Sequence, residues 1–283
     1  MNLKIKPREI DTLTPMPVSV VQLARMAGDP HMHVSDLAQV IEYDEALTAN
    51  LLRLANSTWF IGMEPIMTVK EAVVRMGTAQ ILKMVVGRHL AGPMSTAIPG
   101  YDLAEHEHWR HSVAAALAAE HLSSLLFKPM PGLAFTVSLM HDIGKLILGR
   151  RLGSDIVSQI HRAVKEEQIS FVEAERLIMG TNHAEMGAEI ARYWKFPEPM
   201  INAIELHHDP DVQPDALIDL VHIGNIVARL MGVGLGCEEL HLKTSQQAPK
   251  RLGVSPANLE QVCAKVLLEL DRADELLTGQ VPV

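Results

Sequence analysis

A histidine and an aspartate stand next to each other within an apolar stretch of the chain. His141 and Asp142 lie in the segment from Phe135 to Leu148. Burying a polar side chain without a partner costs ~2–7 kcal/mol, and an unpaired charge costs more. We therefore expect either a metal ion or a buried hydrogen-bond network to satisfy the pair.

Further histidines have similarly apolar neighbours in the sequence. Each by itself is explained by a structural role, such as a hydrogen-bonded core residue or a favourable contact with the end of a helix dipole. Together, five histidines and one aspartate favour a common site assembled from several helices. Imidazole and carboxylate groups are natural ligands for Zn, Fe, Mn or Ni. The candidate metal ligands are His111, His141, Asp142, His183, His207 and His208.

Lys145 follows Asp142 by three residues, a spacing at which two side chains meet on one helix face. We expect one helix to carry His141, Asp142 and Lys145, with the first two side chains about 100° apart around its axis. The alternative for the Asp142–Lys145 pair is a surface salt bridge.

Apolar residues repeat at helical spacing along most of the chain. We expect helices to start after Asp44, Thr68, Asn182 and Pro197, and Ser255 is expected to cap the last one. A long helix from about residue 104 to 126 carries His111, and its small residues allow another helix to approach. No convincing stretch has the period of two that strands require, so the predicted fold class is all-α.

Two Gly/Pro pairs between residues 91 and 100 indicate a junction between two helical lobes. The predicted division is an N-terminal helical lobe over residues 1–98, a second helical lobe with the histidines over residues 99–235, and a helical tail over residues 236–283.

The composition of the 283 residues, 48% hydrophobic and 21% charged, is that of a globular protein. A formal net charge of −9 argues against a broad nucleic-acid footprint. The two cysteines, Cys237 and Cys263, form no CxxC motif. Neither a secretory leader nor an apolar stretch of the ~20 residues needed for a membrane span is visible, so we expect a cytoplasmic protein that does not enter a membrane.

Several of these motifs resemble a known family. His111, the His141-Asp142 pair and a later polar residue resemble the H…HD…D pattern of the HD metal-dependent phosphohydrolase superfamily. His183 and His207-His208 resemble the larger ligand set of its HD-GYP branch. Residues 13–17 (LTPMP), 43–57 (YDEALTANLLRLANS) and 69–77 (VKEAVVRMG) resemble the HDOD domain, an HD-related output domain of bacterial signalling. The resemblance covers roughly residues 10–235 and implies that the second lobe is an HD-type helical bundle.

The chain departs from the HD pattern in two places. By spacing, the last aspartate of the pattern falls at Asn225, whose amide oxygen can bind a metal without contributing charge; Asp219 is the alternative. His207-His208 is followed by Asp209-Pro210 without a Gly-Tyr-Pro signature, which argues against cyclic-di-GMP hydrolysis of the HD-GYP type.

The sequence is compatible with three functions. The resemblance implies a regulatory output module with little or no catalysis, which contacts signalling proteins and responds to a bound metal or nucleotide. The second is a phosphohydrolase of nucleotides or cyclic nucleotides, with Asp142 and Lys145 as catalytic residues and Fe, Mn, Zn, Ni or Mg as cofactor. The third is a helical scaffold without metal or ligand. The sequence determines neither the partner nor the oligomeric state.

Overall fold

The computed structural model describes residues 13, 15–27, 33–56, 66–126, 131–238 and 244–278. It is 74% helical and contains no strand within these ranges, which confirms the all-α prediction. Thr14 and Ser57, two residues of the family-like segments, lie outside the described residues, as do residues 1–12 and 279–283. No helix in the described ranges is long and apolar enough to cross a membrane.

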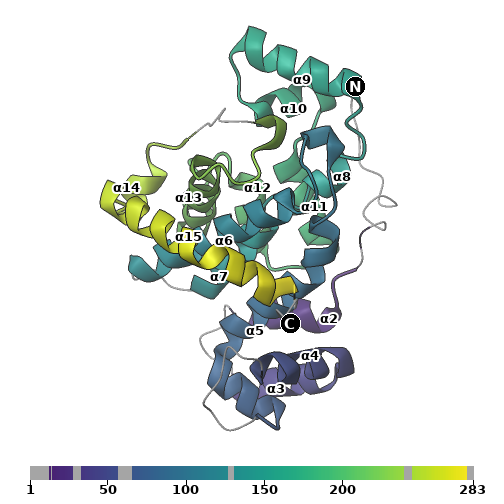
Figure 1. The fold of residues 1–283 in the computed structure, drawn as a ribbon, viewed down its shortest axis with the longest axis vertical. Coiled ribbons are helices and arrows are strands. Elements are labelled where there is room, and N and C mark those ends of the chain that lie inside the picture. The colour runs from purple at the N-terminus through teal and green to yellow at the C-terminus, as the bar shows by residue number, and fades with distance from the viewer. Residues whose placement is uncertain are drawn as a thin grey trace.

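The helices form one continuous assembly in which the N-terminal helices sit at one end (Figure 1). In chain order they are α2 (Val18–Met26), α3 (Val34–Glu42), α4 (Glu45–Ala55), α5 (Val69–Met94), η2 (Pro99–Tyr101), α6 (Glu107–Leu125), α7 (Pro131–Met140), α8 (Lys145–Leu148), α9 (Ser154–Glu167), α10 (Phe171–Met179), α11 (His183–Tyr193), α12 (Glu198–Leu206), α13 (Ala216–Leu230), η3 (Gly236–Glu238), α14 (Ala248–Leu252) and α15 (Pro256–Thr278).

Local capping explains where several helices begin. The Asp44 carboxylate accepts a hydrogen bond of 2.9 Å from the Leu47 amide at the start of α4. Thr68 and Glu71 form a capping box at the start of α5. The Asn182 side chain accepts from the Glu185 amide at the start of α11. These three predicted helix starts are confirmed.

Helix α5 bends at Gly77, whose φ of +74° is a conformation that favours glycine. The helix then continues to Met94 and includes residues 91–94, which the sequence analysis assigned to a junction. Pro93 has no amide hydrogen to donate to the His89 carbonyl, and the helix ends directly after it at Met94. The division into residues 1–98, 99–235 and 236–283 stays a prediction.

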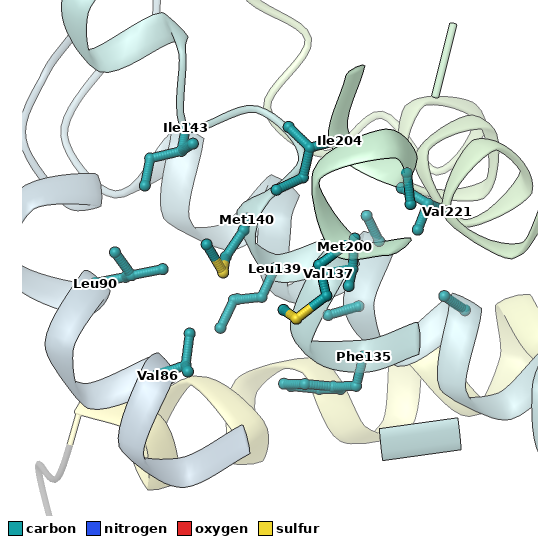
Figure 2. Packing of buried hydrophobic residues seen from close by; sticks show 14 of the residues in the cluster. Val86, Leu90, Phe135, Val137, Leu139, Met140, Ile143, Met200, Ile204 and Val221 are labelled. Atoms are coloured by element: carbon teal, nitrogen blue, oxygen red, sulfur yellow. The ribbon is translucent and has the colours of Figure 1, made fainter. Parts of the chain in front are cut away.

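Helix α7 is the central helix of the core. Its residues from Leu133 to Met140 are all buried. Figure 2 shows Leu139 and Met140 facing Val86 and Leu90 of α5, with Met200 of α12 nearby on the other side. A helix that is apolar around its whole circumference needs neighbours on all sides. Here α5, α6, α12 and α13 supply them.

Helices α6 and α13 approach each other closely. At Gly224 of α13, an added Cβ would lie 2.6 Å from the Ala115 carbonyl oxygen of α6. The small residues on α6 therefore allow close helix contact, as predicted. Helix α15 lies across α6 and α5 and closes this side of the bundle (Figure 1).

The predicted helix through His141, Asp142 and Lys145 is wrong. Helix α7 ends at Met140 and α8 begins at Lys145. The four residues between them form turns closed by short-range bonds, including one of 2.9 Å from the Lys145 amide to the Asp142 carbonyl. The turn is shaped by contact with α11, because a Cβ at Gly144 would lie only 2.0 Å from the His183 carbonyl oxygen.

Candidate metal centre

The carboxylate of Asp142 lies at the centre of the histidine cluster and is 1% exposed. Its Oδ2 atom is 2.7 Å from Lys145 Nζ, 3.3 Å from His141 Nε2 and 3.6 Å from His111 Nε2. Its Oδ1 atom is 3.3 Å from His183 Nε2 and 3.7 Å from His207 Nε2. The two oxygens of one carboxylate therefore face two different sets of imidazoles.

These side chains come from separate segments of the chain. His111 lies on α6, His141 and Asp142 lie in the turn before α8, and His183 is the first residue of α11. His207 and His208 follow the end of α12, and the Nε2 atoms of His183 and His208 are 2.8 Å apart. The structure brings together all six residues that the sequence analysis grouped into one site.

Hydrogen bonds orient the imidazoles. The Nδ1 atoms of His111, His141 and His207 lie 2.9, 2.6 and 2.6 Å from the carbonyl oxygens of Val233, Ser138 and Ile204. Since a carbonyl oxygen only accepts hydrogen bonds, the proton belongs on each Nδ1. Each Nε2 then presents a lone pair towards Asp142, the arrangement in which metal-binding histidines are held.

His183 is oriented in the same way by a carboxylate. Its Nδ1 atom lies 2.7 Å from Glu175 Oε2, and the other Glu175 oxygen accepts a hydrogen bond from the Tyr101 hydroxyl group. Burial by itself lowers the pKa of His183, but the Glu175 charge and hydrogen bond outweigh it and raise that pKa overall.

Burial keeps most of the other imidazoles neutral. It lowers the pKa of His111 to about 4, and it lowers the pKa values of His207 and His208 well below their ordinary value. For Asp142, burial raises the pKa, but its interactions with the His141 imidazole and the Lys145 ammonium group lower that pKa well below its usual range. An ionised Asp142 beside neutral His111, His207 and His208 has the protonation states that metal binding requires.

Three buried atoms of this cluster have no hydrogen-bond partner among the described residues. They are His141 Nε2, His207 Nε2 and Asp142 Oδ1. Their lone pairs point at other electron-pair donors, an arrangement that a cation stabilises. The possible ligand atoms form two groups, each within 4.8 Å: His111, His141 and Asp142, and Asp142, His183, His207 and His208.

The donor atoms fit some of the predicted metals better than others. Imidazole nitrogens outnumber carboxylate oxygens in both groups, which suits Zn, Fe or Ni better than Mn. Mg²⁺ prefers oxygen ligands in octahedral geometry and suits this set least.

Asn225 lies at the edge of the cluster, buried on α13. Its Oδ1 atom is 3.1 Å from His111 Nε2. The contact is favourable if both atoms face one cation, or if the amide is rotated so that its nitrogen donates to the imidazole. The alternative residue, Asp219, instead accepts hydrogen bonds of 2.6 and 2.9 Å from Arg251, so it does not supply the last position of the pattern.

The structure adds residues that the sequence analysis missed. Lys145 Nζ is 2.5 Å from Glu238 Oε1, and Arg229 donates to the other Glu238 oxygen over 2.6 Å. Glu238 comes from the predicted tail and follows a glycine-rich segment without periodicity, so no sequence pattern indicated it. Glu175 could have been found, because it shares a helix face with the apolar residues Phe171 and Met179.

The helical bundle with its buried His/Asp cluster defines an all-α protein of the HD type. The family model described as the HDOD domain matches residues 13–210, which is more than half of the chain. The chain therefore belongs to the HDOD domain family, as the sequence motifs predicted.

Solved structures show the same fold. An HDOD domain protein of unknown function from Geobacter sulfurreducens has a TM-score of 0.68 at 22% identity, over 98% of this chain and 97% of that one. A candidate phosphohydrolase from Shewanella amazonensis SB2B has a TM-score of 0.64 at 21% identity, over 97% of both chains. A candidate signal transduction protein from Marinobacter aquaeolei VT8 has a TM-score of 0.71 at 22% identity, over 98% of this chain and 62% of that one.

A sequence relative is longer than this chain. An uncharacterized protein from Treponema pallidum (strain Nichols) is 25% identical over 229 residues, which cover 78% of this chain and 43% of the relative. The match thus spans less than half of that relative's length.

Proposed function

We propose that this chain is a signalling output module that binds divalent metal in its HD-type core. It hydrolyses nucleotides or cyclic nucleotides slowly or not at all. One observation carries the proposal: a full set of oriented metal ligands surrounds Asp142, while the lysine beside it is enclosed by carboxylates.

The metal part of the proposal rests on the lone pairs of the cluster. Four imidazoles direct Nε2 towards one carboxylate, and their Nδ1 atoms are held by oxygen acceptors. Without a cation this cluster would leave buried electron-pair donors facing one another. Either of the two ligand groups, or both through the shared Asp142, would hold a metal.

The slow or absent catalysis rests on the surroundings of Lys145. Its ammonium group is held between Asp142 and Glu238, and the residue is 5% exposed. Glu238 also pairs with Arg229, so one carboxylate engages both cations that a substrate phosphate would need.

The space near the cluster is small as well. A cavity of about 20 Å³ is lined by residues that include His208, Asn225 and Glu238. This volume holds about one water molecule, whereas small-molecule sites measure about 300–1,000 Å³. A nucleotide does not fit into this cavity in the present conformation.

A phosphohydrolase is the second candidate, and the retained Asp142 with its two ligand groups favours it. A bound metal would supply Lewis-acid chemistry. Lys145 and Arg229 would neutralise the phosphate of a nucleotide or cyclic nucleotide once Glu238 had moved away.

Two measurements separate these functions. We expect metal in protein purified without added metal, loss of that metal in Asp142→Ala, and its retention in Asp155→Ala, a control on the exposed side of α9. We also expect no turnover above that of the Asp142→Ala variant across a panel of nucleotides and cyclic dinucleotides. Protein that stays metal-free even after incubation with Zn, Fe, Mn and Ni would refute metal binding. Robust turnover that Asp142→Ala abolishes would establish the hydrolase instead.

The output role requires partners. We propose that signalling proteins of a bacterial cytoplasm receive the signal through direct contact, and that a nucleotide is a second ligand. Co-purification with tagged wild-type protein, compared with Asp142→Ala, tests whether such contacts depend on the metal.

A further inference from the structure

A second cavity is lined by residues of the N-terminal helices α2 and α4 and of α5. Figure 1 shows α4 and α5 in the lower half of the molecule. Its volume is about 250 Å³, more than ten times that of the space beside the metal cluster. None of the residues that line it belongs to that cluster. They are Pro17, Val20, Asp44, Leu47, Asn50, Met84, Val85, Arg88 and His89.

One wall of this cavity carries a cation without a counter-ion. The Arg88 guanidinium has no hydrogen bond or ion pair with any described residue, and its charged neighbour is another cation, Arg53. Arg88 is solvent-exposed, and the limited burial of its guanidinium group, followed by the charge of Arg53, lowers its pKa. Two neighbouring guanidinium groups repel each other, so an anion between them or beside them is stabilised.

The neutral polar groups of the cavity leave hydrogen-bonding capacity for a ligand. The Asn50 amide has no hydrogen-bond partner among the described residues and lines the cavity. The Asp44 carboxylate, by contrast, is already engaged: Ser19 donates to Oδ2 over 2.6 Å and the Leu47 amide donates to Oδ1. Its negative charge sits at the N-terminus of α4, where the helix dipole stabilises it.

Apart from His89, the rest of the lining is apolar. Val20, Leu47 and Met84 are at most 5% exposed and contribute aliphatic or thioether surface next to the polar groups. Cavities that combine an apolar wall with a few convergent polar groups are typical of small-molecule sites.

We propose that this cavity binds a small organic anion, with its phosphate or carboxylate group on Arg88 and its apolar body against Val20, Leu47 and Met84. The Asn50 amide then donates to an oxygen of the anion or accepts from a polar group of the body. Phosphate monoesters and carboxylates share this chemistry.

Calorimetry with phenyl phosphate tests the site. We expect saturable binding with a Kd of about 1 mM or tighter. Comparison with benzoate shows whether the cavity prefers a carboxylate or a phosphate. Inorganic phosphate lacks the apolar body of the proposed ligand and phenol lacks its anionic group, so each should bind at least about tenfold more weakly than phenyl phosphate. Phenol binding as tightly as phenyl phosphate would overturn the role of Arg88.

Two variants and one control complete the test. Arg88→Gln should weaken phenyl phosphate by about tenfold or more, because a hydrogen bond to a charged group is lost. Val85→Phe, which fills the cavity from α5, should abolish binding while thermal unfolding shows a folded protein. Arg162→Gln removes the same charge from the exposed face of α9 and should leave the Kd within about twofold. The proposal would be overturned if wild-type protein did not bind phenyl phosphate. It would also be overturned if wild type, Arg88→Gln and Val85→Phe bound it equally, because the anion would then bind at the metal centre or elsewhere.

Discussion

The turn before α8 packs against α11 so tightly that no Cβ fits at Gly144, which makes this glycine a sharp test of the site. Gly144 has φ of −62° and ψ of −25°, a conformation that alanine adopts without strain. An added Cβ would nevertheless lie 2.0 Å from the His183 carbonyl oxygen and 2.7 Å from the Gly187 amide nitrogen. The cost of Gly144→Ala therefore comes from space and not from backbone conformation.

The size of the effect follows from these distances. Ordinary contact begins near 3.4 Å, so the turn and α11 must separate by about 1.4 Å. The atoms in the way are backbone atoms, which cannot rotate aside. Overpacking a core costs about 1–3 kcal/mol, and we expect about 3 kcal/mol here. Since α11 carries His183, the same shift should weaken metal binding by about 10–100-fold.

Urea unfolding and metal titration measure the two effects separately. Gly92→Ala is the matched control, because Gly92 is exposed in α5 and an added Cβ meets nothing within 4 Å. It should leave metal affinity unchanged and change the free energy of unfolding by less than about 1 kcal/mol, because the helix preference of alanine is offset by crowding of its Cβ against Pro93. If Gly144→Ala matched wild type in both measurements, the close packing of the turn against α11 would be refuted.

Four further predictions concern charge and protonation. Asn225→Asp should tighten metal binding by about tenfold, because a carboxylate adds charge beside His111; unchanged affinity in calorimetry would show that this position does not face the metal. Glu238→Gln should destabilise the protein by about 3 kcal/mol in urea unfolding, because it leaves Lys145 and Arg229 buried without their shared carboxylate; a change below about 1 kcal/mol would contradict that role. His108 is buried with neither ring nitrogen hydrogen-bonded to a described residue, and burial lowers its pKa to about 3, so the unfolded chain binds a proton below about pH 6.5 that the folded chain excludes. This histidine therefore lowers stability as pH falls from 6.5 towards 3, and His108→Phe should reduce that loss by up to about 1.4 kcal/mol per pH unit; identical pH slopes would refute it. Removing metal with a chelator should lower the free energy of unfolding by about 3 kcal/mol if the metal was present at about 100 times its Kd, and Asp142→Ala should not respond to the chelator.

The sequence by itself determined the helices and much of the ligand set. Helix starts at Asp44, Thr68 and Asn182 depend on side chains that bind amides three residues away, so local sequence is sufficient to predict them. His141 and Asp142 stood out because polar groups in an apolar segment require partners. The similarly apolar surroundings of the other histidines placed them in the same site, and the family motifs agreed with that grouping.

Only the tertiary structure decided how the site is closed and which residues support it. The turn at His141 depends on contact between Gly144 and α11, which lies about 40 residues further along the chain. Asp219 carries the charge that Asn225 lacks, yet its partner Arg251 on α14 holds it outside the cluster. Glu238 reaches Lys145 from a glycine-rich segment without periodicity. Such contacts depend on long-range packing, which local spacing does not encode, and therefore no pattern in the sequence could predict them.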